Sequence, residues 1–400
     1  MRTYKSKKTT ASWRSCRLKD FCEKRTAKNV DKKYNSVLTN SAIYGVIKQE
    51  EYFEKEVAND ENTGTYYIVN PKDFIYNPRI SENAPYGPIR ANETGEAGIV
   101  SPLYFVFGIS DSTGVDYDFL KYYFTSSNWH QYIYSIGNNG ARCDRMNIAD
   151  ADFMNMTINL PPLAEQKRIA EILGCCDRMI ALKKELIAEK KRQKKALMQK
   201  LLDPDSDFRL PGFVGEWQKA HLGDFIELVS GVDRPTKSLL TDNKYTPYLT
   251  GASNIESSNL ILNRWVIHPK NIALQGDILI VCKGSGVGRM VIMNIPRAHI
   301  ARQFMAIRSS EKVVTKYIYY ILKDSLEKIK KEAQGLIVGF DRQTILRLEV
   351  VIPSKGEQQI IVDILSAADK EIDLLEQELE QQQQKKKSLM QLLLTGIVRV

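Results

Sequence analysis

Three loops in this 400-residue chain combine glycine with arginine, lysine or amide side chains. They span residues 137–145 (GNNGARCDR), 283–289 (KGSGVGR) and 335–342 (GLIVGFDR). Arginine, lysine and amide side chains read base edges, whereas cationic side chains and backbone N–H groups hold phosphates. Glycine lets the backbone approach a phosphate closely. The loops therefore favour contact with a polyanion such as DNA.

The residues that we expect to contact DNA lie in or near these loops. The first set consists of Asn138, Asn139, Arg142, Arg145, Gln334 and Arg342. The loop at 283–289 contributes Lys283, Ser285 and Arg289, and four further candidates are Arg79, Arg90, Arg302 and Gln303. For any single arginine the alternative role is a surface salt bridge. For residues 283–289 it is a plain β-hairpin turn.

The chain lacks the residue patterns of catalysis. Residues 283–289 fit neither of the glycine patterns that bind nucleotides, GxxxxGK[S/T] and GxGxxG. Residues 83–86 (NAPY) imitate the (N/D)PP(Y/F) element of a methyltransferase, but no apolar strand precedes them, which favours a turn. Asp277 and Lys283 imitate part of a nuclease motif, yet Val281 stands where an acid is required. We therefore expect Asp277 to begin a strand and the chain not to be an enzyme.

Composition narrows the class of protein further. The four histidines are isolated and no Cys/His spacing suits zinc, so we expect no metal and no cofactor in this chain. Six irregularly spaced cysteines are typical of reduced thiols. The basic N-terminus lacks the apolar stretch of a signal peptide, and no apolar run is long enough for a membrane span. A cytoplasmic location is therefore expected, and the net charge of +9 suits a polyanionic partner.

An internal repeat indicates the elements that must position the loops. Residues 160–202 and 352–394 align at a constant offset of 192 without a gap, and 16 of the 43 positions are identical. A weaker repeat at offset 204 relates Trp13 to Trp217. The chain therefore reads as a globular domain, a long helix, a second globular domain and a second long helix.

Both long repeats carry apolar residues at steps of three and four, the pattern of a coiled-coil seam. In the first helix these are Ile169, Ile172/Leu173, Cys176, Met179/Ile180 and Leu186/Ile187. In the second they are Ile361, Ile364/Leu365, Ala368, Ile372, Leu375 and Leu379. The first repeat holds 11 basic and 5 acidic residues and the second holds 5 and 8, so their opposite charges favour mutual packing.

The linker between the halves predicts the direction of packing. A helix over 160–202 is about 60 Å long, whereas the roughly 14 residues before Trp217 reach at most about 50 Å. The second globular domain must then begin near the far end of the first helix. We expect a mixed α/β chain with two globular domains and two helices packed as an antiparallel coiled coil with pseudo-twofold symmetry. Its predicted parts are 1–160, 161–202, 203–352 and 353–400.

Five segments carry a resemblance to a known family. Residues 160–173 (LPPLAEQKRIAEIL) and 351–365 (VIPSKGEQQIIVDIL) resemble the twice-repeated entry to the conserved helices of type I restriction–modification specificity subunits. Residues 38–49 (LTNSAIYGVIKQ), 98–107 (GIVSPLYFVF) and 208–217 (FRLPGFVGEW) resemble stretches of that family's target-recognition domains. One departure is that FRLPGFVGEW has no counterpart before Trp13.

The resemblance implies a division of labour. Domains 1–160 and 203–352 would each read one half of a bipartite, asymmetric DNA target, and the two helices would set the gap between the halves. Two methyltransferase subunits would dock for adenine methylation, and motor-nuclease subunits would join for restriction. The partner subunits would use S-adenosylmethionine, ATP and Mg²⁺. Two alternatives remain at this point: a stand-alone nuclease or methyltransferase with an unfamiliar site, and a coiled-coil scaffold that joins two protein-binding modules.

Overall fold

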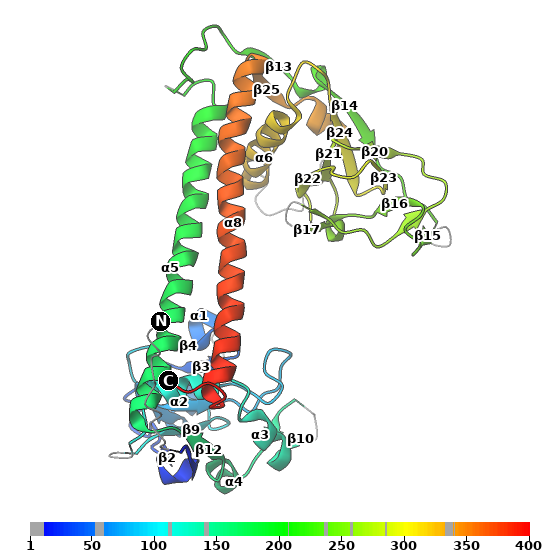
Figure 1. Cartoon of the computed structure of the whole chain (residues 1–400). Coiled ribbons are helices and arrows are strands. Elements are labelled where there is room, and N and C mark those ends of the chain that lie inside the picture. Colours follow the sequence, from blue (N-terminus) through cyan, green and yellow to red (C-terminus); the bar gives the residue numbers. More distant parts are fainter. Residues whose placement is uncertain are drawn as a thin grey trace, which may run out of the picture. The chain divides into compact units, whose positions relative to one another are not determined.

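The chain forms two compact units. The computed structural model describes residues 12–52, 60–110, 114–139, 144–206, 208–235, 239–256, 259–284, 286–332, 339 and 341–400. Unit 1 comprises residues 1–184 and 378–400, and unit 2 comprises residues 185–377. Each unit contains part of two 40-residue helices, α5 (Leu163–Leu202) and α8 (Lys355–Leu394) (Figure 1). The mixed α/β class predicted from the sequence is confirmed.

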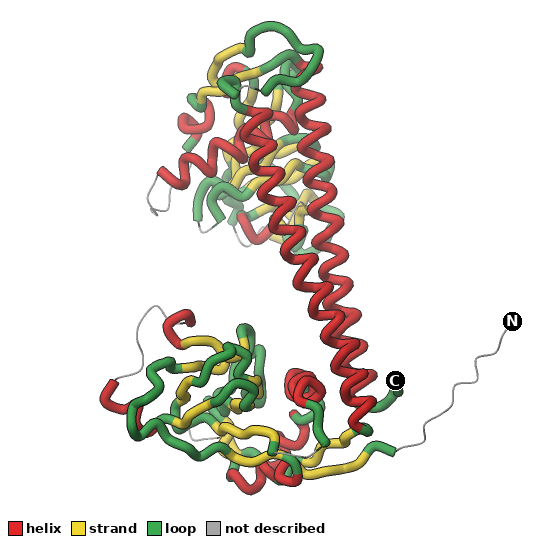
Figure 2. The backbone as a smooth tube through the Cα atoms, turned by 90° about the vertical axis from the view of Figure 1, so that its left-hand side faces the viewer, coloured by secondary structure: helices red, strands yellow, loops and turns green. Residues whose placement is uncertain are grey.

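Unit 1 is built on a four-stranded antiparallel sheet, with small two-stranded sheets around it (Figure 2). In spatial order its strands are β2 (Cys22–Lys24), β9 (Phe105–Ile109), β6 (Phe74–Tyr76) and β7 (Ile89–Ala91). The paired strands around it are β1 (Arg14–Arg17) with β12 (Thr157–Leu160), β3 (Leu38–Ser41) with β4 (Gly45–Lys48), β5 (Tyr67–Val69) with β8 (Gly98–Val100), and β10 (Asn138–Asn139) with β11 (Met146–Asn147). The shorter helices are α1 (Gln49–Tyr52), α2 (Tyr117–Thr125), α3 (His130–Ile136) and α4 (Asp150–Met154).

Unit 2 contains a four-stranded antiparallel sheet and a five-stranded mixed sheet. The first has the order β14 (Ile226–Ser230), β24 (Phe304–Ser309), β21 (Ile278–Val281) and β22 (Met290–Ile292). The second has the order β15 (Leu239–Leu240), β19 (Trp265–Val266), β16 (Thr246–Leu249), β23 (Arg297–Ile300) and β20 (Ile272–Leu274). Two further strand pairs are β13 (Gln218–His221) with β25 (Glu349–Ile352) and β17 (Ile255–Glu256) with β18 (Asn259–Leu260). The shorter helices are α6 (Thr315–Glu332) and α7 (Arg342–Leu346).

The two four-stranded sheets repeat one plan. In unit 1, Cys22 pairs with Ile109 and Phe74 with Phe107. In unit 2, Ile226 pairs with Ser309 and Ile278 with Ile307. The first residues of these pairs are related by the offset of 204 that Trp13 and Trp217 show in the sequence. Strand order and register therefore repeat although most side chains differ.

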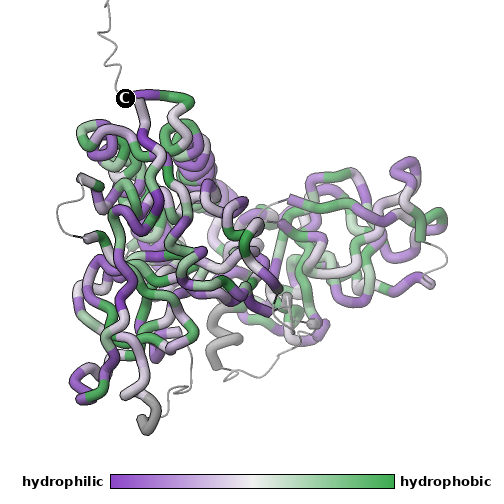
Figure 3. Tube along the Cα trace, turned by 90° about the horizontal axis from the view of Figure 1, so that it is seen from below, coloured by the Kyte–Doolittle hydropathy of each residue, from purple (hydrophilic) through white to green (hydrophobic). Residues whose placement is uncertain are grey.

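Each unit buries apolar side chains between its sheet and its helices. In unit 1 the rings of Phe74 and Phe107 stack at 5.3 Å, and Leu393 at the end of α8 belongs to the same core. In unit 2, Met198 and Leu201 at the end of α5 join the core. Apolar and polar residues alternate along the trace of both units (Figure 3). The end of one long helix thus completes the core that the start of the other long helix leaves open.

The two long helices run antiparallel within each unit. In unit 1, Asp177 pairs with Lys386 and Lys183 with Glu378, and in unit 2 Lys190 pairs with Glu371 at 2.6 Å and Lys194 with Asp369. Residue numbers rise along one helix as they fall along the other. No helix in the described ranges is both long enough and apolar enough to cross a membrane.

A buried glutamine fixes the entry to each long helix. Gln166 donates to the Pro161 carbonyl at 2.8 Å and accepts from the Asp116 N–H, just before α2, at 2.7 Å. Gln358 makes the same two contacts, with Pro353 at 2.9 Å and with the Val314 N–H, just before α6, at 2.8 Å. Both side chains are 1% exposed. The long helix is therefore tied to the shorter helix of the same unit.

Candidate nucleic-acid interface

The glycine-rich loop at 283–289 is a hairpin turn that joins β21 to β22. The Gly288 N–H donates to the Val281 carbonyl at 2.8 Å, and Gly284 and Gly288 adopt φ of 89° and 83°. These angles lie in the left-handed region that glycine enters without strain. Lys283 and Arg289 are exposed at the two ends of the turn, while Ser285 lies outside the described residues. A hairpin turn and a DNA-contacting loop are thus compatible.

Gln303 lies beside this turn. Its backbone carbonyl accepts from the Cys282 N–H at 2.7 Å, and a Cβ on Gly251 would lie 1.8 Å from its side-chain oxygen. The exposed Gln303 amide therefore passes directly over the Gly251 backbone. The neighbouring Arg302 makes a surface ion pair with Asp233 at 2.9 Å, so the alternative role considered for an arginine is realised at this position.

Arg342 begins α7 and is partly anchored. Asp341 caps that helix by accepting from the Thr344 N–H at 2.6 Å, and one guanidinium nitrogen of Arg342 donates to the Leu228 carbonyl at 2.8 Å. The side chain is exposed, so its other nitrogens remain accessible to solvent. A Cβ on Gly339 would lie 3.4 Å from the Cys282 carbonyl, which places this segment near the hairpin turn. Gln334 lies outside the described residues.

In unit 1 the structure brings Arg79 and Arg145 together. They face each other across an antiparallel bridge, and the flanking bonds join Ile80 N–H to the Asp144 carbonyl at 2.9 Å and Met146 N–H to the Pro78 carbonyl at 2.9 Å. The Arg145 guanidinium lies 3.5 Å from the Asp144 carboxylate and lowers the pKa of that group. Two cationic side chains thus share one strip of surface.

Two asparagines and two arginines complete the predicted set in unit 1. Asn138 is exposed in β10 opposite Asn147. Arg142 and the side chain of Asn139 lie outside the described residues. Arg90 is partly buried, which lowers its pKa, and it donates to the carbonyls of Ile89 at 2.9 Å and Ala42 at 3.4 Å. The guanidinium of Arg90 therefore ties β7 to the β3–β4 turn.

Sequence reasoning missed three surface hollows, two of which are lined in part by predicted residues. In unit 1 a cavity of about 470 Å³ is lined by polar groups that include Lys24, Arg145, Asn147 and Asp150. In unit 2 one of about 660 Å³ is lined in part by Arg289, Tyr319 and Lys323. A groove of about 740 Å³ shares Tyr319 and Lys323 and adds five lysines, namely Lys191, Lys194, Lys195, Lys316 and Lys370. The lysine run of α5 was the only sequence signal for this groove.

The residues that imitated catalytic motifs have structural roles. Asp277 is 3% exposed and accepts two hydrogen bonds from Arg308, at 3.1 and 2.9 Å, and one from the Leu274 N–H at 2.8 Å. It precedes β21, as the sequence predicted. Ala84 forms reciprocal backbone bonds with Ser81, so residues 81–84 form a turn. No group of three or more histidine, cysteine, aspartate or glutamate side chains suited to a metal occurs among the described residues.

Comparison with known proteins agrees with a nucleic-acid interface. Residues 11–192 and 215–383 match the family model of the type I restriction modification DNA specificity domain. The type I restriction enzyme MjaVIII specificity subunit of Methanocaldococcus jannaschii is 28% identical over 275 residues, which cover 62% of this chain and 63% of that protein. The EcoDI specificity subunit of Escherichia coli is 23% identical over 181 residues, which cover 45% and 37%. The matched region thus spans less than two thirds of these relatives.

Solved structures share the fold. A chain from a study of complex assembly and conformational transition in the type I R-M system matches with a TM-score of 0.63 at 17% identity, over 96% of this chain and 97% of that one. The type I restriction-modification S subunit from M. genitalium matches with a TM-score of 0.54 at 15% identity, over 97% of both chains. Because the family model covers most of the sequence, the chain belongs to the family of type I restriction modification DNA specificity domains.

Proposed function

We propose that this chain is the specificity subunit of a cytoplasmic type I restriction–modification complex and reads a bipartite, asymmetric DNA target. One observation carries the proposal beyond family membership. The two units share a four-stranded sheet of the same order, but the exposed cations and amides around it differ. Unit 1 places Arg79 and Arg145 face to face, whereas unit 2 presents Lys283 and Gln303 at a hairpin turn. A repeated scaffold with different surface groups suits two different half-sites.

The DNA contacts are assigned by chemistry. Arg145, Asn138 and Arg79 would face the first half-site, and Gln303, Lys283 and Arg289 the second. Amide and guanidinium groups with free donors discriminate base edges, whereas the lysines are suited to phosphates. Arg342 would contact DNA with the nitrogens that do not hold Leu228. Asn139, Arg142, Ser285 and Gln334 stay in the proposed set on the sequence argument alone.

We further propose that α5 and α8 form an antiparallel coiled coil that separates two target-recognition domains, 1–160 and 203–352, in a pseudo-twofold arrangement. The helical segments 161–202 and 353–400 would set the gap between the half-sites. Antiparallel ion pairs in both units and the twin contacts of Gln166 and Gln358 support this arrangement.

The chain is proposed to be non-catalytic, with two methyltransferase subunits and motor-nuclease subunits as partners. Cys175, Met179 and Leu182 are exposed on α5 at steps of four and three residues, with Met179 46% and Leu182 65% exposed. Such spacing is typical of a second coiled-coil seam, which a partner helix would cover. The partners would bring S-adenosylmethionine, ATP and Mg²⁺ to the complex.

Mapping of methylated adenines tests the proposal. The chain is coexpressed with its methyltransferase subunits in a host that lacks adenine methylation, and the genome is sequenced for methylated bases. Methylation should occur at one split motif and should vanish without this chain. Methylation regardless of sequence would refute the proposal. A scaffold of protein-binding modules would instead show no steep salt dependence of DNA binding, because no phosphate-bound counterions are released.

A further inference from the structure

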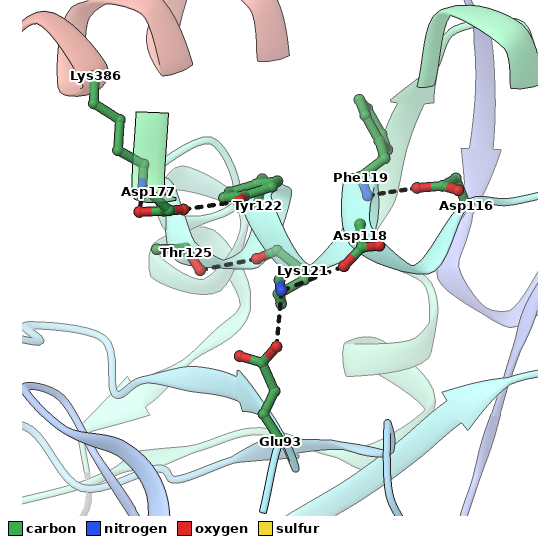
Figure 4. Close-up of polar contacts among 9 residues, drawn as sticks. All are labelled: Glu93, Asp116, Asp118, Phe119, Lys121, Tyr122, Thr125, Asp177 and Lys386. Carbon is green, nitrogen blue, oxygen red and sulfur yellow. Dashed lines mark hydrogen bonds and ion pairs between the residues drawn. The ribbon is translucent and has the colours of Figure 1, made fainter. Parts of the chain in front are cut away.

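Each unit contains the same set of three polar residues where a shorter helix meets the two long helices. In unit 1 the Tyr122 hydroxyl donates to Asp177 Oδ2 at 2.8 Å, and Lys386 Nζ pairs with Asp177 Oδ1 (Figure 4). In unit 2 the Tyr320 hydroxyl donates to Asp369 Oδ2 at 2.7 Å, and Lys194 Nζ pairs with Asp369 Oδ1. We call these two sets the triads.

The two triads agree in finer geometry. Lys386 Nζ lies 5.4 Å from the centre of the Tyr122 ring, and Lys194 Nζ lies 5.5 Å from the centre of the Tyr320 ring. In both, the tyrosine and the lysine therefore approach each other as well as the shared carboxylate. The aspartates and the lysines are each related by the sequence offset of 192.

Each triad joins three separate elements. The tyrosine comes from the short helix of its unit, α2 or α6, and the aspartate from the long helix that follows that short helix in the chain. The lysine comes from the opposite long helix. Figure 4 shows Lys386 extending from α8 to Asp177 on α5, with the Tyr122 side chain pointing to the same carboxylate. A triad thus fixes a pair of long helices and the globular part beside them at once.

The triads specify one antiparallel register. Asp177 and Lys194 are 17 residues apart on α5, and their partners Lys386 and Asp369 are 17 residues apart on α8, in the opposite direction. Moving one helix by one residue shifts a side chain by about 1.5 Å along the axis and turns it by about 100°. Any such shift would break both ion pairs. An apolar seam alone is less selective, because neighbouring apolar residues can take one another's places.

Burial makes the ion pair of the unit 2 triad the more selective of the two, because Lys194 and Asp369 are less exposed than Lys386 and Asp177. Lys194 is 8% exposed, and loss of solvation, with the nearby Lys323, lowers its pKa. Burial, reinforced by the hydrogen bond to Asp177, raises the pKa of Tyr122, and burial raises that of Tyr320. A buried ion pair adds little net stability over an apolar pair of equal size, but an unpaired member is strongly unfavourable. The triads therefore penalise wrong arrangements more than they stabilise the right one.

We propose that the two Tyr–Asp–Lys triads are positioning residues that hold the two half-sites of the DNA target at a single separation. They do so by fixing the register of α5 against α8 and the attachment of each globular part to the helices. The inference rests on the proposed function and identifies the residues that fix the gap between the two half-sites. Neither lysine is expected to touch DNA.

The test replaces both charged members of the unit 2 triad with apolar residues, Asp369→Leu with Lys194→Leu, in the full chain with its methyltransferase subunits. Methylation is measured on a library of DNA duplexes that carry both half-sites at gaps from three base pairs below to three above the native one. Because an apolar pair retains stability, we expect an unchanged melting temperature and unchanged half-site sequences. The preference for the native gap over its neighbours should fall at least about tenfold, equivalent to about 1.4 kcal/mol.

Two matched controls make the outcome decisive. Lys183→Leu with Glu378→Leu removes an exposed ion pair from the same helices and should leave the gap preference unchanged. The exchange Asp369→Lys with Lys194→Asp re-forms the pair with reversed charge and should retain the preference that Lys194→Leu alone loses. If the apolar double variant keeps its gap preference, the triads do not position the half-sites. If even the natural chain methylates without a split motif, the proposed function fails instead.

Discussion

Both units bury an aspartate just before the central strand of the four-stranded sheet, but each supplies its arginine from a different strand. Asp277 in unit 2 is held by Arg308 from β24, at 3.1 and 2.9 Å. Asp73 in unit 1 is held by Arg25, which directly follows β2, at 3.1 Å. Asp73 and Asp277 are 4% and 3% exposed. Both units therefore contain the same aspartate–arginine ion pair, but the arginine comes from a different position in the sheet.

A glycine in unit 1 explains how the arginine can come from a different strand. Gly108 occupies the strand position in unit 1 that Arg308 occupies in unit 2, since their cross-strand partners are Glu23 and Glu227. A Cβ on Gly108 would lie 2.5 Å from both the Arg25 guanidinium and the Asp73 carboxylate. Removing the side chain from one strand therefore makes room for the arginine of the next. Burial raises the pKa of Asp73, and the hydrogen bonds from Asn70 and Arg25 oppose that shift.

The largest predicted effect comes from breaking this pair in unit 2 and then rebuilding it in the unit 1 arrangement. Arg308→Gly leaves the buried Asp277 carboxylate without a cation and should lower the free energy of unfolding of unit 2 by about 3–5 kcal/mol. Adding Val229→Arg places an arginine at the position equivalent to Arg25 and should recover most of the loss. Urea denaturation, with hydrogen exchange of the β21 peptide, measures both effects.

The reciprocal change in unit 1 serves as the control. Gly108→Ala adds only a methyl group, yet it should displace Arg25 from Asp73 and destabilise unit 1, while unit 2 keeps its exchange rates. If Val229→Arg gives no recovery in the Arg308→Gly background, the two arrangements are not interchangeable, and the equivalence of the two sheets does not extend to their buried charges.

In each unit an arginine beyond the end of one long helix binds a glutamate in the first turn of the other long helix. Arg209, in the segment after α5, donates to both carboxylate oxygens of Glu357 at 3.2 and 3.1 Å and lies over the Trp217 ring. Arg399, after α8, donates to both oxygens of Glu165 at 2.5 and 2.7 Å and lies over the Trp13 ring. Arg399 thus takes in unit 1 the role that Arg209, in the 208–217 segment, has in unit 2.

Loss of this arginine should cost more in unit 1 than in unit 2. The Trp217 indole also donates to Glu357 at 3.2 Å, whereas the Trp13 indole nitrogen has no partner among the described residues. Arg399→Ala should therefore lower the stability of unit 1, because the largely buried Glu165 carboxylate loses both hydrogen bonds from the guanidinium. Arg209→Ala should cost unit 2 less, because Glu357 keeps one donor.

Removal of residues 395–400 tests the same contact, because the truncation also deletes Arg399. Thermal unfolding followed by hydrogen exchange of the β12 segment should show that the truncated chain and Arg399→Ala lose the same protection in unit 1. Arg399→Lys should restore the charge but not the two-point contact, and so recover only part of the stability. Equal losses in Arg399→Ala and Arg209→Ala would show that the tryptophan contact contributes nothing.

The sequence predicted those features that depend on periodicity. The repeat with its apolar steps of three and four predicted both long helices, and Asp277 was expected to begin the strand that is β21. The sequence pattern could not tell which of Leu186 and Ile187 is buried, because both fit a seam with steps of three and four residues. In the structure Leu186 is 42% exposed and Ile187 is 6% exposed. Only the partner helix decides which of two adjacent residues is covered.

The remaining contacts were hidden for a different reason. Arg25 and Arg308 serve one role from different strands, and Arg209 and Arg399 serve one role from positions 190 residues apart. An alignment at a constant offset cannot match such pairs. The same applies to the lysines that line the groove of unit 2, which come from α5, α6 and α8 and become neighbours only after folding.

A smaller effect is expected from single changes on the proposed DNA surface. Arg342 is held by Leu228 at one nitrogen, which orients the rest of its guanidinium, whereas Lys283 is exposed at the end of a turn. Arg342→Ala should cost about 1–3 kcal/mol of binding to DNA with the correct second half-site and little on DNA without it. Lys283→Ala should weaken binding to all sequences and reduce the salt slope by about one. Titrations at several salt concentrations separate the two, and an equal loss on random DNA would make Arg342 a phosphate contact.

The smallest predicted effect is a pH dependence that distinguishes the units. His299 is fully buried; its Nδ1 accepts from the Lys270 N–H at 3.0 Å, so Nε2 must donate to the Val232 carbonyl at 2.8 Å. This neutral ring stacks on Tyr248, and burial, with the charge of Arg234, lowers its pKa below the usual 6.5, although the Val232 carbonyl and Asp233 oppose the shift.

Below pH 6.5 the His299 imidazole therefore binds a proton in the unfolded chain, whereas in folded unit 2 it stays neutral to a lower pH. Stability rises with pH through that window and is lost as the pH falls, by at most about 1.4 kcal/mol per pH unit. His299→Gln keeps a donor for Val232 without a titrating ring. The protection factor of the β23 amides, which is corrected for the base-catalysed intrinsic exchange rate, should therefore lose its dependence on pH between 5 and 6.5. In unit 1, His130 is only half-buried, and His130→Gln should change the slope less. If the slope for β23 persists in His299→Gln, another group in unit 2 takes up the proton.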